Sequence, residues 1–437
     1  MSETADALRS RVGYVARGSS AEPLPGVVGF FLAFRTVTVL LAVRAFGADP
    51  ELGTAVNVGL DFFLLGVVAF CTLLDQRAQG VSMLQLPVVR WALLFLGFSF
   101  CSLLWSSTVS LPDSSLYWCS MAADVAIVGL LLQARSLEHP TEALMQGYVW
   151  GACVVALIVW IMPAETDLRL GDEELLGPNQ IGYVCALACF FAQYLLRETR
   201  RRSVLPAGML AVTLLRSLSK TTIVAFLVSE GFLLARDRSI SRRTKVLVSL
   251  ATLIVIGVFS SLLTSYYDVY TNAGNQSETL TGRLGIWAYF LAEAIQQPWI
   301  GHGFDSAWKV IPPFGADQFQ AAHAHNELLQ QFYAYGVVGV GIFFGLYGSL
   351  LRQIRRVATS RQRTFFLALL IFVLVRGLAD TDRFDLSLPL WSVMIVAWLT
   401  ESARRKATDK KDAAAGWYAR ARNLQSCNAP AAAGLSK

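Results

Sequence analysis

The 437-residue sequence has few charged side chains and few histidines. Only 16% of its residues are Asp, Glu, Lys or Arg, 54% are hydrophobic, and there are 4 histidines. Soluble domains carry about a quarter charged residues, so this composition excludes an ordinary soluble domain and indicates a protein that crosses a membrane several times. The net charge of +6 does not indicate a nucleic-acid partner, because the basic residues cluster in short segments between apolar runs, where they determine membrane topology.

Several motifs of enzyme chemistry are also missing. The chain has no GxxxxGK[ST] loop, no HExxH helix and no GxSxG elbow. We therefore expect neither ATP chemistry nor a protease-type nucleophile. Cys185 and Cys189 stand four residues apart without an accompanying histidine or further cysteine, so no zinc site is expected there.

The first apolar run starts near Val27 and has the length of a membrane span, so we expect no cleavable signal peptide.

Apolar segments long enough to cross about 30 Å of hydrocarbon recur along the chain. They lie near residues 27–46, 52–74, 88–107, 116–134, 141–163, 179–196, 203–218, 219–235, 246–264, 326–350, 363–379 and 384–400. The sequence thus predicts an all-α polytopic membrane protein of about 12 transmembrane helices. At residues 216–220 the division is less distinct, and two short segments there could also form one bent helix.

The distribution of charge predicts the orientation of these helices. With the N-terminus in the cytoplasm, the loops that return there include the densely basic segments 197–202, 236–245, 352–363 and 404–406. The opposite side receives the acidic segment 164–178 and a long segment whose only cations are Arg283 and Lys309. The predicted divisions are a cytoplasmic arm at 1–26, helices 1–9 at 27–264, a large extracytoplasmic loop at 265–325, helices 10–12 at 326–400 and a cytoplasmic tail at 401–437.

The large loop is too long for a plain connection, and long loops are often functional. Within it, residues 284–297 have the pattern of an amphipathic helix that lies along the membrane surface. Pro298 ends this helix, and residues 301–304 predict a turn.

Two histidines, His323 and His325, are followed by Asn326 and then by an apolar run. A titratable side chain at the mouth of a hydrophobic helix is suited to proton chemistry at the boundary of water and lipid, although an interfacial histidine can also simply cap a helix. The predicted topology puts these histidines on the same side as residues 216–220, Arg283 and residues 376–385. Cations at the helix ends on this side could bind a polyanion such as a lipid-linked diphosphate. Alternatively, these side chains contact only the lipid head groups.

Asp380 and Asp382 form a DxD pair of the kind found in metal-dependent nucleotide-sugar enzymes. Nucleotide sugars are cytoplasmic, whereas this pair is predicted to lie outside. We expect one of the two carboxylates to orient a histidine or an arginine, or else to lie in a solvated loop.

Two further groups of residues lie within apolar runs. The glycines at 336, 339, 341 and 345 predict close helix packing. Arg35, Asp61 and Asp124 are costly inside a membrane, so we expect them to pair or to face a cavity.

Residues 325–339 fit the pattern H-N-x9-G-x-x-G. This pattern resembles the signature of the O-antigen ligase family, whose superfamily also contains O-antigen and exopolysaccharide polymerases. LSKTT at 218–222, TGRLGIW at 281–287 and PWIGHGF at 298–304 are similar to the family's serine-rich segment, its TGR…W segment and its PW-G-GF turn. The resemblance covers residues 175–400, approximately.

The resemblance implies a bacterial inner-membrane glycosyltransferase with both termini in the cytoplasm. It would move a glycan from undecaprenyl diphosphate to an acceptor hydroxyl of lipid A-core or another glycan, without a metal ion or other cofactor. His325 would be the base that activates the acceptor, and Arg283 would bind the diphosphate. We assign His323, Asn326 and Asp382 to substrate binding as well.

One departure from the family pattern concerns a donor-binding cation. The arginine that follows the family's serine-rich segment is Lys220 here, and Arg216 stands one helical turn earlier. Because lysine lacks the bidentate fork of arginine, either Arg216 takes over this contact or the site holds its donor differently.

Two other functions stay open at this stage. A polymerase of the same superfamily would use another lipid-linked repeat as acceptor, and the segment HAHNELLQ also resembles exopolysaccharide polymerases. A secondary transporter or flippase would have paired repeats, discontinuous helices and charges deep in several spans. The charges here favour one membrane face instead.

Overall fold

The computed structural model describes residues 23–74, 83–134, 140–162, 169–172, 175–198, 204–237, 241–272, 280–313 and 320–427. Within these ranges the regular structure is helical, apart from an isolated antiparallel bridge between Asp172 and Leu176. The predicted all-α class is confirmed.

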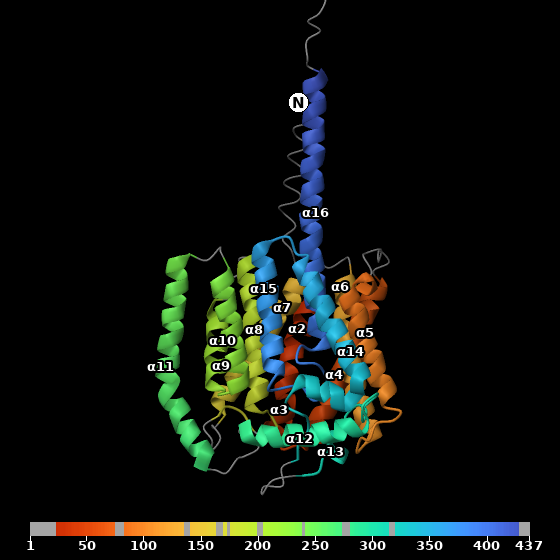
Figure 1. Ribbon diagram of the computed structural model, residues 1–437, viewed down its shortest axis with the longest axis vertical. Helices are drawn as coiled ribbons and strands as arrows, with labels where there is room; N and C mark the ends of the chain where they lie inside the picture. The colour runs from red at the N-terminus through yellow and green to blue at the C-terminus, as the bar shows by residue number, and fades with distance from the viewer. Residues whose placement is uncertain are drawn as a thin grey trace, which may run out of the picture.

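Long helices stand side by side in a bundle, and shorter helices lie at one of its ends (Figure 1). The bundle consists of α2 (Pro23–Phe34), α3 (Thr38–Phe46), α4 (Pro50–Leu74), α5 (Pro87–Ser102), α6 (Leu111–Gln133), α7 (Pro140–Ile161), α8 (Pro178–Glu198), α9 (Val204–Arg216), α10 (Lys220–Arg236), α11 (Arg242–Asn272), α14 (Glu327–Arg355), α15 (Ser360–Gly377) and α16 (Leu390–Cys427). The helices at the end are α12 (Leu280–Gln296) and α13 (Ala307–Val310), and the 3-10 helices are η1 (Arg35–Val37) and η2 (Met83–Gln85).

Six helical segments are long and apolar enough to cross a membrane by length and composition. They are Pro23–Phe46, Pro50–Leu73, Leu111–Gln133, Pro140–Ile161, Pro178–Glu198 and Glu327–Arg355. Pro87–Ser102 and Val204–Arg216 are shorter apolar helices. The polytopic membrane protein is therefore confirmed, and the count of twelve spans stays a prediction.

The helix bounds differ from the predicted segments at several places. The first segment is broken by η1, and at residues 216–220 the chain forms two helices, α9 and α10, separated by residues 217–219, and not one bent helix. Helix α11 continues to Asn272, eight residues into the predicted large loop. The last helix begins at Leu390 and continues to Cys427, so the described part of the predicted tail prolongs α16. Residues 1–22 of the predicted arm lie outside the described residues.

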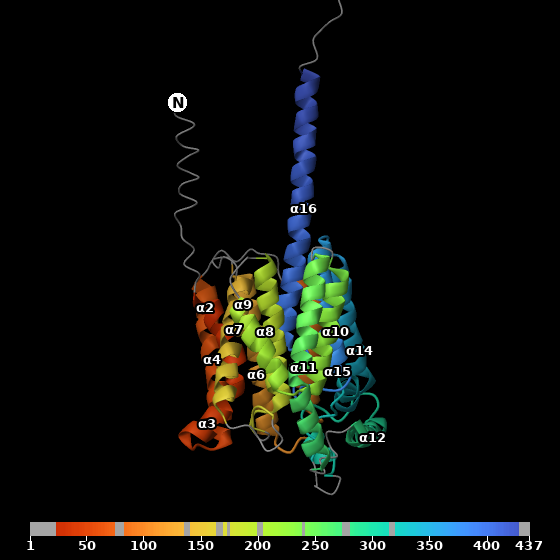
Figure 2. The same ribbon diagram turned by 90° about the vertical axis from the view of Figure 1, so that its left-hand side faces the viewer.

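The two ends of the bundle differ in what they carry. Helix α16 projects from one end, and α12 lies across the opposite end (Figures 1 and 2). The basic connection between α14 and α15 is at the end from which α16 projects, because α14 starts beside α12 and runs away from it. Basic connections and the α12 segment thus lie at opposite ends, as the charge pattern requires, while the orientation in the membrane stays a prediction.

Helix α12 buries one stripe of its surface. Ile286, Phe290 and Ala294, which are spaced four residues apart, are fully buried, while Leu284 and Leu291 on other faces are exposed. This is the burial pattern of an amphipathic helix with one face on the bundle. The amphipathic helix expected at 284–297 is present and begins four residues earlier.

The three charges within the apolar runs pair with one another, as expected. The guanidinium of Arg35 lies 2.6 Å from an oxygen of Asp124 and 3.6 Å from an oxygen of Asp61. The hydroxyl of Ser120 donates a hydrogen bond to Asp61. This cluster joins η1 to α4 and α6 through charges that would otherwise be costly in hydrocarbon.

Candidate functional site

The start of α14 is fixed by two side chains that also hold the segment after α15. The Asn326 amide oxygen accepts from the Leu329 backbone N–H at 3.0 Å, which caps the helix, and its NH2 donates to the Leu378 carbonyl at 3.0 Å. The buried Glu327 carboxylate accepts from the Ser387 backbone N–H at 2.9 Å. These bonds clamp the chain before α14 against the segment 378–389.

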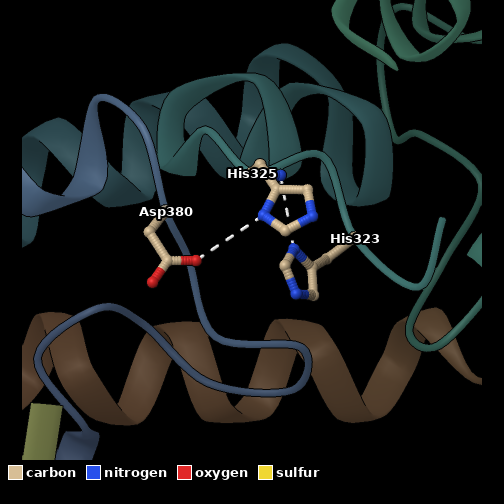
Figure 3. A group of neighbouring side chains, drawn as sticks. All are labelled: His323, His325 and Asp380. Atoms are coloured by element: carbon tan, nitrogen blue, oxygen red, sulfur yellow. Dashed lines mark hydrogen bonds and ion pairs between the residues drawn. The ribbon is translucent and has the colours of Figure 1, made fainter. Parts of the chain in front are cut away.

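The backbone of His325 has φ = 49°, in the left-handed region that non-glycine residues seldom adopt. Such a conformation costs about 1–3 kcal/mol and needs support from its surroundings. Support comes from Gln330, whose side-chain oxygen accepts from the Ala324 N–H at 2.8 Å, and from the cap of Asn326. The turn directs the imidazole of His325 toward the segment after α15 (Figure 3).

Gly336, the tenth residue of α14, interrupts this helix. Its φ of 63° and ψ of −158° are non-helical, so the carbonyls and N–H groups around it lack helical partners. The segment 298–303 supplies them: His302 N–H donates to the Tyr333 carbonyl at 3.0 Å, and Val337 N–H donates to the Pro298 carbonyl at 2.8 Å. Gly336 therefore forms a docking point for the segment 298–303 and not the close helix contact that we expected.

Close helix packing is found at only some of the other glycines. A Cβ added at Gly345 would lie 2.6 Å from Trp91 of α5, whereas one added at Gly341 would meet nothing within 4 Å. The prediction of packing through small residues is thus right for Gly345 and wrong for Gly341.

Asp380 links His325 to an arginine. Its Oδ1 lies 3.6 Å from Nδ1 of His325, and its Oδ2 accepts a hydrogen bond of 2.8 Å from Arg376. The second ring nitrogen of His325 points away from Asp380 (Figure 3). The separation of 3.6 Å exceeds a hydrogen bond, and contacts of this kind tighten when a substrate binds. Of the DxD pair, Asp380 is the residue placed to orient the histidine.

Neighbouring side chains stabilise the ionised form of Asp380. Burial alone would raise the pKa of this carboxyl, but the positive charge of Arg376 and the contact with His325 outweigh it and lower the pKa below its usual range. The Arg376 guanidinium also stacks on the Tyr183 ring, 4.3 Å from its centroid. Asp380 is therefore ionised at neutral pH and fixed on both sides.

His323 lies against His325, with 4.2 Å between the ring centroids. Its Nδ1 accepts from the His325 backbone N–H at 3.3 Å. Burial, together with the neighbouring His325, lowers the pKa of His323 to about 3. The His323 ring is therefore neutral at pH 7, and its one lone-pair nitrogen is Nδ1, which accepts from the His325 N–H.

These three side chains open into a cavity of about 520 Å³ between the start of α8 and the segments 320–326 and 378–389. Its wall includes His323, His325, Arg376, Asp380, Asp382, Arg383, Arg169, Asn179 and Gln180. Among the described residues the wall thus combines guanidinium groups, carboxylates, amides and imidazoles. Such a set can hold an anionic, hydroxyl-rich molecule.

Arg283 does not line the cavity, but it contacts the chain next to a residue of the cavity wall. Its guanidinium donates to the Ala379 carbonyl at 2.6 Å and to the Thr221 hydroxyl at 3.2 Å. It thereby connects α12 to the first turn of α10 and to the residue before Asp380. The structure brings the TGR segment, the LSKTT segment and the histidine pair together, although they are far apart in sequence.

Arg216 and Lys220 are not part of the cavity wall. They flank the turn 217–219, in which Leu218 has φ = 54°, and the residue of this turn that contacts the wall is Ser219. Its hydroxyl donates to the side-chain oxygen of Asn179 at 2.8 Å. At the wall itself the turn presents a hydroxyl, and contact of Arg216 or Lys220 with the donor stays a prediction.

Sequence reasoning missed Arg169 and did not separate Arg376 and Arg383 from the stretch that contains them. Arg383 donates to Asp305 Oδ1 at 3.0 Å and lies over the Trp308 ring at 5.0 Å from its centroid. A signal for Arg169 was present, because it is a cation in an acidic segment on the side where cations are scarce.

An apolar groove adjoins the site on the outer side of α14. It measures about 660 Å³, and α12 and α14 form its walls through residues such as Trp287, Leu291, Phe332 and Phe344. Asn326 lies at this groove, whereas its neighbour His325 lies at the polar cavity. The start of α14 therefore separates a polar compartment from an apolar one.

The comparison with known proteins agrees with this arrangement. Residues 181–344 match the family model described as O-antigen ligase. Over these residues the chain is similar to the O-antigen ligase family. A curated O-antigen ligase of Pseudomonas aeruginosa is 26% identical over 310 residues, which cover 68% of this chain and 72% of that protein. The family match supports a multi-pass bacterial membrane protein of the superfamily of glycan-transferring ligases and polymerases.

The family match includes some of the site and leaves some of it out. Arg283, His323, His325 and Gly336 lie inside the matched range, whereas Asp380 lies beyond its end. The residue that faces His325 is thus identified by the structure and not by the family match.

Proposed function

We propose that this protein is an O-antigen ligase-type glycosyltransferase that acts on the extracytoplasmic side of the bacterial inner membrane. The donor is a glycan carried on undecaprenyl diphosphate, and the acceptor is a hydroxyl of lipid A-core or of another glycan. The observation that carries the proposal is the series His325–Asp380–Arg376 at the wall of a polar cavity, directly beside an apolar groove.

In the proposed reaction His325 is the general base. With a proton on Nδ1 facing Asp380, the opposite nitrogen is free to accept the proton of the acceptor hydroxyl. The acceptor oxygen then bonds to the anomeric carbon as the bond from that carbon to the diphosphate oxygen breaks. Undecaprenyl diphosphate leaves with the electron pair, and the imidazolium passes its proton to water. Our proposed step uses no metal ion or other cofactor.

Cations are needed where the diphosphate leaves, because negative charge develops on it. Arg283 lies behind the wall next to Asp380 and would reach the diphosphate by exchanging its bond to the Ala379 carbonyl for a phosphate oxygen. Arg216 and Lys220 flank the neighbouring turn and would contribute charge to the approach of the donor. Because lysine lacks the bidentate fork of arginine, we expect it to be a poor substitute at this position.

Three other side chains are assigned to the glycan. His323 and Asp382 lie on the cavity wall, and Asn326 stands between the cavity and the groove. Neutral imidazole, carboxylate and amide groups bind sugar hydroxyls well. The apolar groove between α12 and α14 suits the polyprenyl chain of the donor, because it is lined with hydrophobic side chains and ends at the polar site.

The site proposed here requires a definite orientation. Both termini lie in the cytoplasm, which puts the basic connections inside and α12 at the outer surface of the inner membrane. A flippase has less support, because the polar cavity lies at the α12 end of the bundle and not midway along it.

The proposal is tested with His325→Ala. Removal of the base should reduce transfer from purified lipid-linked glycan by about 10²- to 10⁴-fold while the protein still inserts and accumulates. His302→Gln is the control, since His302 is buried away from the cavity and binds the Glu293 carbonyl at 3.0 Å. Full activity of a folded His325→Ala protein would refute the role of His325.

Deletion of the gene separates the two reactions of the superfamily. Accumulation of long unligated chains indicates a ligase, whereas accumulation of single lipid-linked repeats indicates a polymerase. Intact surface glycan of every kind after deletion contradicts both.

A further inference from the structure

Three side chains at the cavity wall have the composition and spacing of a transition-metal site. His323, His325 and Asp380 each offer one ligand atom, and these atoms all lie within 4.8 Å of one another. The histidines come from the segment before α14 and the carboxylate from the segment after α15 (Figure 3). Two imidazoles and one carboxylate are a known ligand set for zinc and for similar divalent ions.

The separation between His325 and Asp380 fits a pair of ligands of a tetrahedral ion better than a hydrogen bond. Zinc binds nitrogen and oxygen at about 2.0–2.2 Å, so two ligand atoms of a tetrahedral site stand about 3.4 Å apart. The Nδ1 of His325 is 3.6 Å from Oδ1 of Asp380, which is too long for a hydrogen bond but close to this value. The same Nδ1 is buried and has no hydrogen-bond partner.

The surroundings leave room for such an ion, and at His323 the ion would replace a long hydrogen bond of 3.3 Å from the His325 N–H. Arg376 donates to Oδ2 of Asp380 and the Thr381 N–H donates to Oδ1 at 3.1 Å, and the second lone pair of Oδ1 is available on the side of His325. The cavity of about 520 Å³ supplies space for a fourth ligand, either water or an oxygen of a bound molecule. The positive charge of Arg376 opposes a second cation, so we expect reversible binding and not a permanent structural metal.

We propose that His323, His325 and Asp380 bind zinc or a similar late first-row divalent ion, and that this ion inhibits the enzyme. The inhibitory consequence rests on the proposed function. A neutral imidazole carries one proton, so a metal ion at Nδ1 of His325 forces that proton onto the opposite nitrogen. That nitrogen can then no longer accept the proton of the acceptor hydroxyl. Metal binding thus blocks the base without occupying the acceptor position.

The binding is measured by calorimetric titration of the purified full-length protein in detergent with Zn²⁺ alone, and with Mg²⁺ as the control ion. We expect Zn²⁺ to bind and Mg²⁺, which prefers oxygen ligands, to give no comparable signal. His323→Ala and Asp380→Asn should each weaken the Zn²⁺ affinity at least about tenfold. Asp113→Asn, which removes an exposed carboxylate elsewhere, should leave it unchanged.

Exposed thiols also bind zinc, so the titration is repeated with Cys71 and Cys101 replaced by serine. The binding that depends on His323 and Asp380 should persist in this background. Zinc binding that disappears with the thiols, or that is equal in wild type and His323→Ala, overturns the site.

Inhibition is measured as the rate of glycan transfer with and without Zn²⁺. The rate of each variant with Zn²⁺ is divided by the rate of the same variant without metal. Wild-type transfer should fall at least about tenfold at saturating Zn²⁺ and recover on addition of a chelator, because the base is blocked. An active wild type that binds Zn²⁺ at this site and is not inhibited overturns the regulatory inference alone. If the metal-free protein transfers no glycan, the proposed function fails, and the titration still decides whether the metal site exists.

Discussion

The contact between Asp380 and His325 leads to a sharp prediction about two carboxylates that stand two residues apart. Asp380 is buried and lies between the His325 ring and the Arg376 guanidinium. Asp382 is exposed, and its carboxylate accepts from the Phe384 backbone N–H at 3.2 Å. Asp380→Asn and Asp382→Asn remove the same charge from the same segment, so their difference isolates the position of the carboxylate.

Asp380→Asn should lower both the stability of the protein and its kcat. Arg376 would lose the partner that it holds at 2.8 Å, and removing one member of a buried pair costs about 3–5 kcal/mol of stability. An amide beside His325 would also stabilise the wrong tautomer, because the amide NH2 can donate to Nδ1 and so leave the proton on the opposite nitrogen. In serine proteases the corresponding Asp-to-Asn change lowers kcat by about 10⁴-fold. We therefore expect a loss of about 10²- to 10⁴-fold in kcat here.

The assay is steady-state transfer from purified lipid-linked glycan, with kcat and KM measured separately. Asp380→Asn should act on kcat, because Asp380 acts through His325 and not on the substrate. Asp382→Asn should change KM by about tenfold at most, the size of one hydrogen bond to a sugar hydroxyl. Thermal denaturation in detergent, followed by tryptophan fluorescence, shows whether each variant is folded at the assay temperature.

The reasoning about Asp380 is wrong if folded Asp380→Asn keeps more than about a tenth of the wild-type kcat, since removal of general-base function should cost more than that. It is also wrong if the two variants lose kcat equally, because then only the charge of the segment matters. A loss confined to stability would assign Asp380 to the fold alone.

Two further predictions concern Arg283 and Gly336. Arg283→Ala should raise the KM for the donor about 10- to 100-fold, and Arg283→Lys should restore little of it, because lysine cannot bind the diphosphate in bidentate fashion; unchanged donor KM in Arg283→Ala would remove Arg283 from diphosphate binding. Gly336→Ala should destabilise the protein by about 1–3 kcal/mol or more, because φ is 63° and the new Cβ would stand 2.3 Å from the Trp299 carbonyl carbon. Gly341→Ala, where a Cβ meets nothing within 4 Å, should leave the melting temperature nearly unchanged, and equal melting temperatures for the two variants would contradict the docking role of Gly336.

The fold was predictable where hydrophobic length determines structure. Each of the twelve predicted segments overlaps a helix or a pair of helices, because a long apolar run in a membrane has to satisfy its backbone internally. Helix ends were less predictable. Helix α16 passes from an apolar half into a charged half without a break, since residues such as Ala403 and Lys406 are good helix formers and no glycine or proline stands within residues 390–415.

The types of residue in the site were predictable from the sequence, but which of their side chains contact one another was less predictable. The histidine pair was found because histidines are scarce and these two stand at a helix start. The choice between Asp380 and Asp382 was not available from sequence, because both stand in one polar segment and only the path of the chain decides which faces His325. The absence of Arg216 and Lys220 from the cavity wall likewise depends on the turn at Leu218, whose φ of 54° has no sequence signal comparable to a glycine.

The unusual backbone positions of the chain explain how this site is held. Among the described residues, the non-glycine residues with positive φ are Leu218, Asp305 and His325. Leu218 precedes Ser219, which binds Asn179 of the cavity wall; Asp305 holds Arg383; and His325 faces Asp380. Each of these conformations costs free energy, about 1–3 kcal/mol, and each is compensated by contacts to a different part of the chain. Strain at three separate segments around one cavity argues that its polar groups are fixed before a substrate arrives, since a cavity free to relax would release that strain.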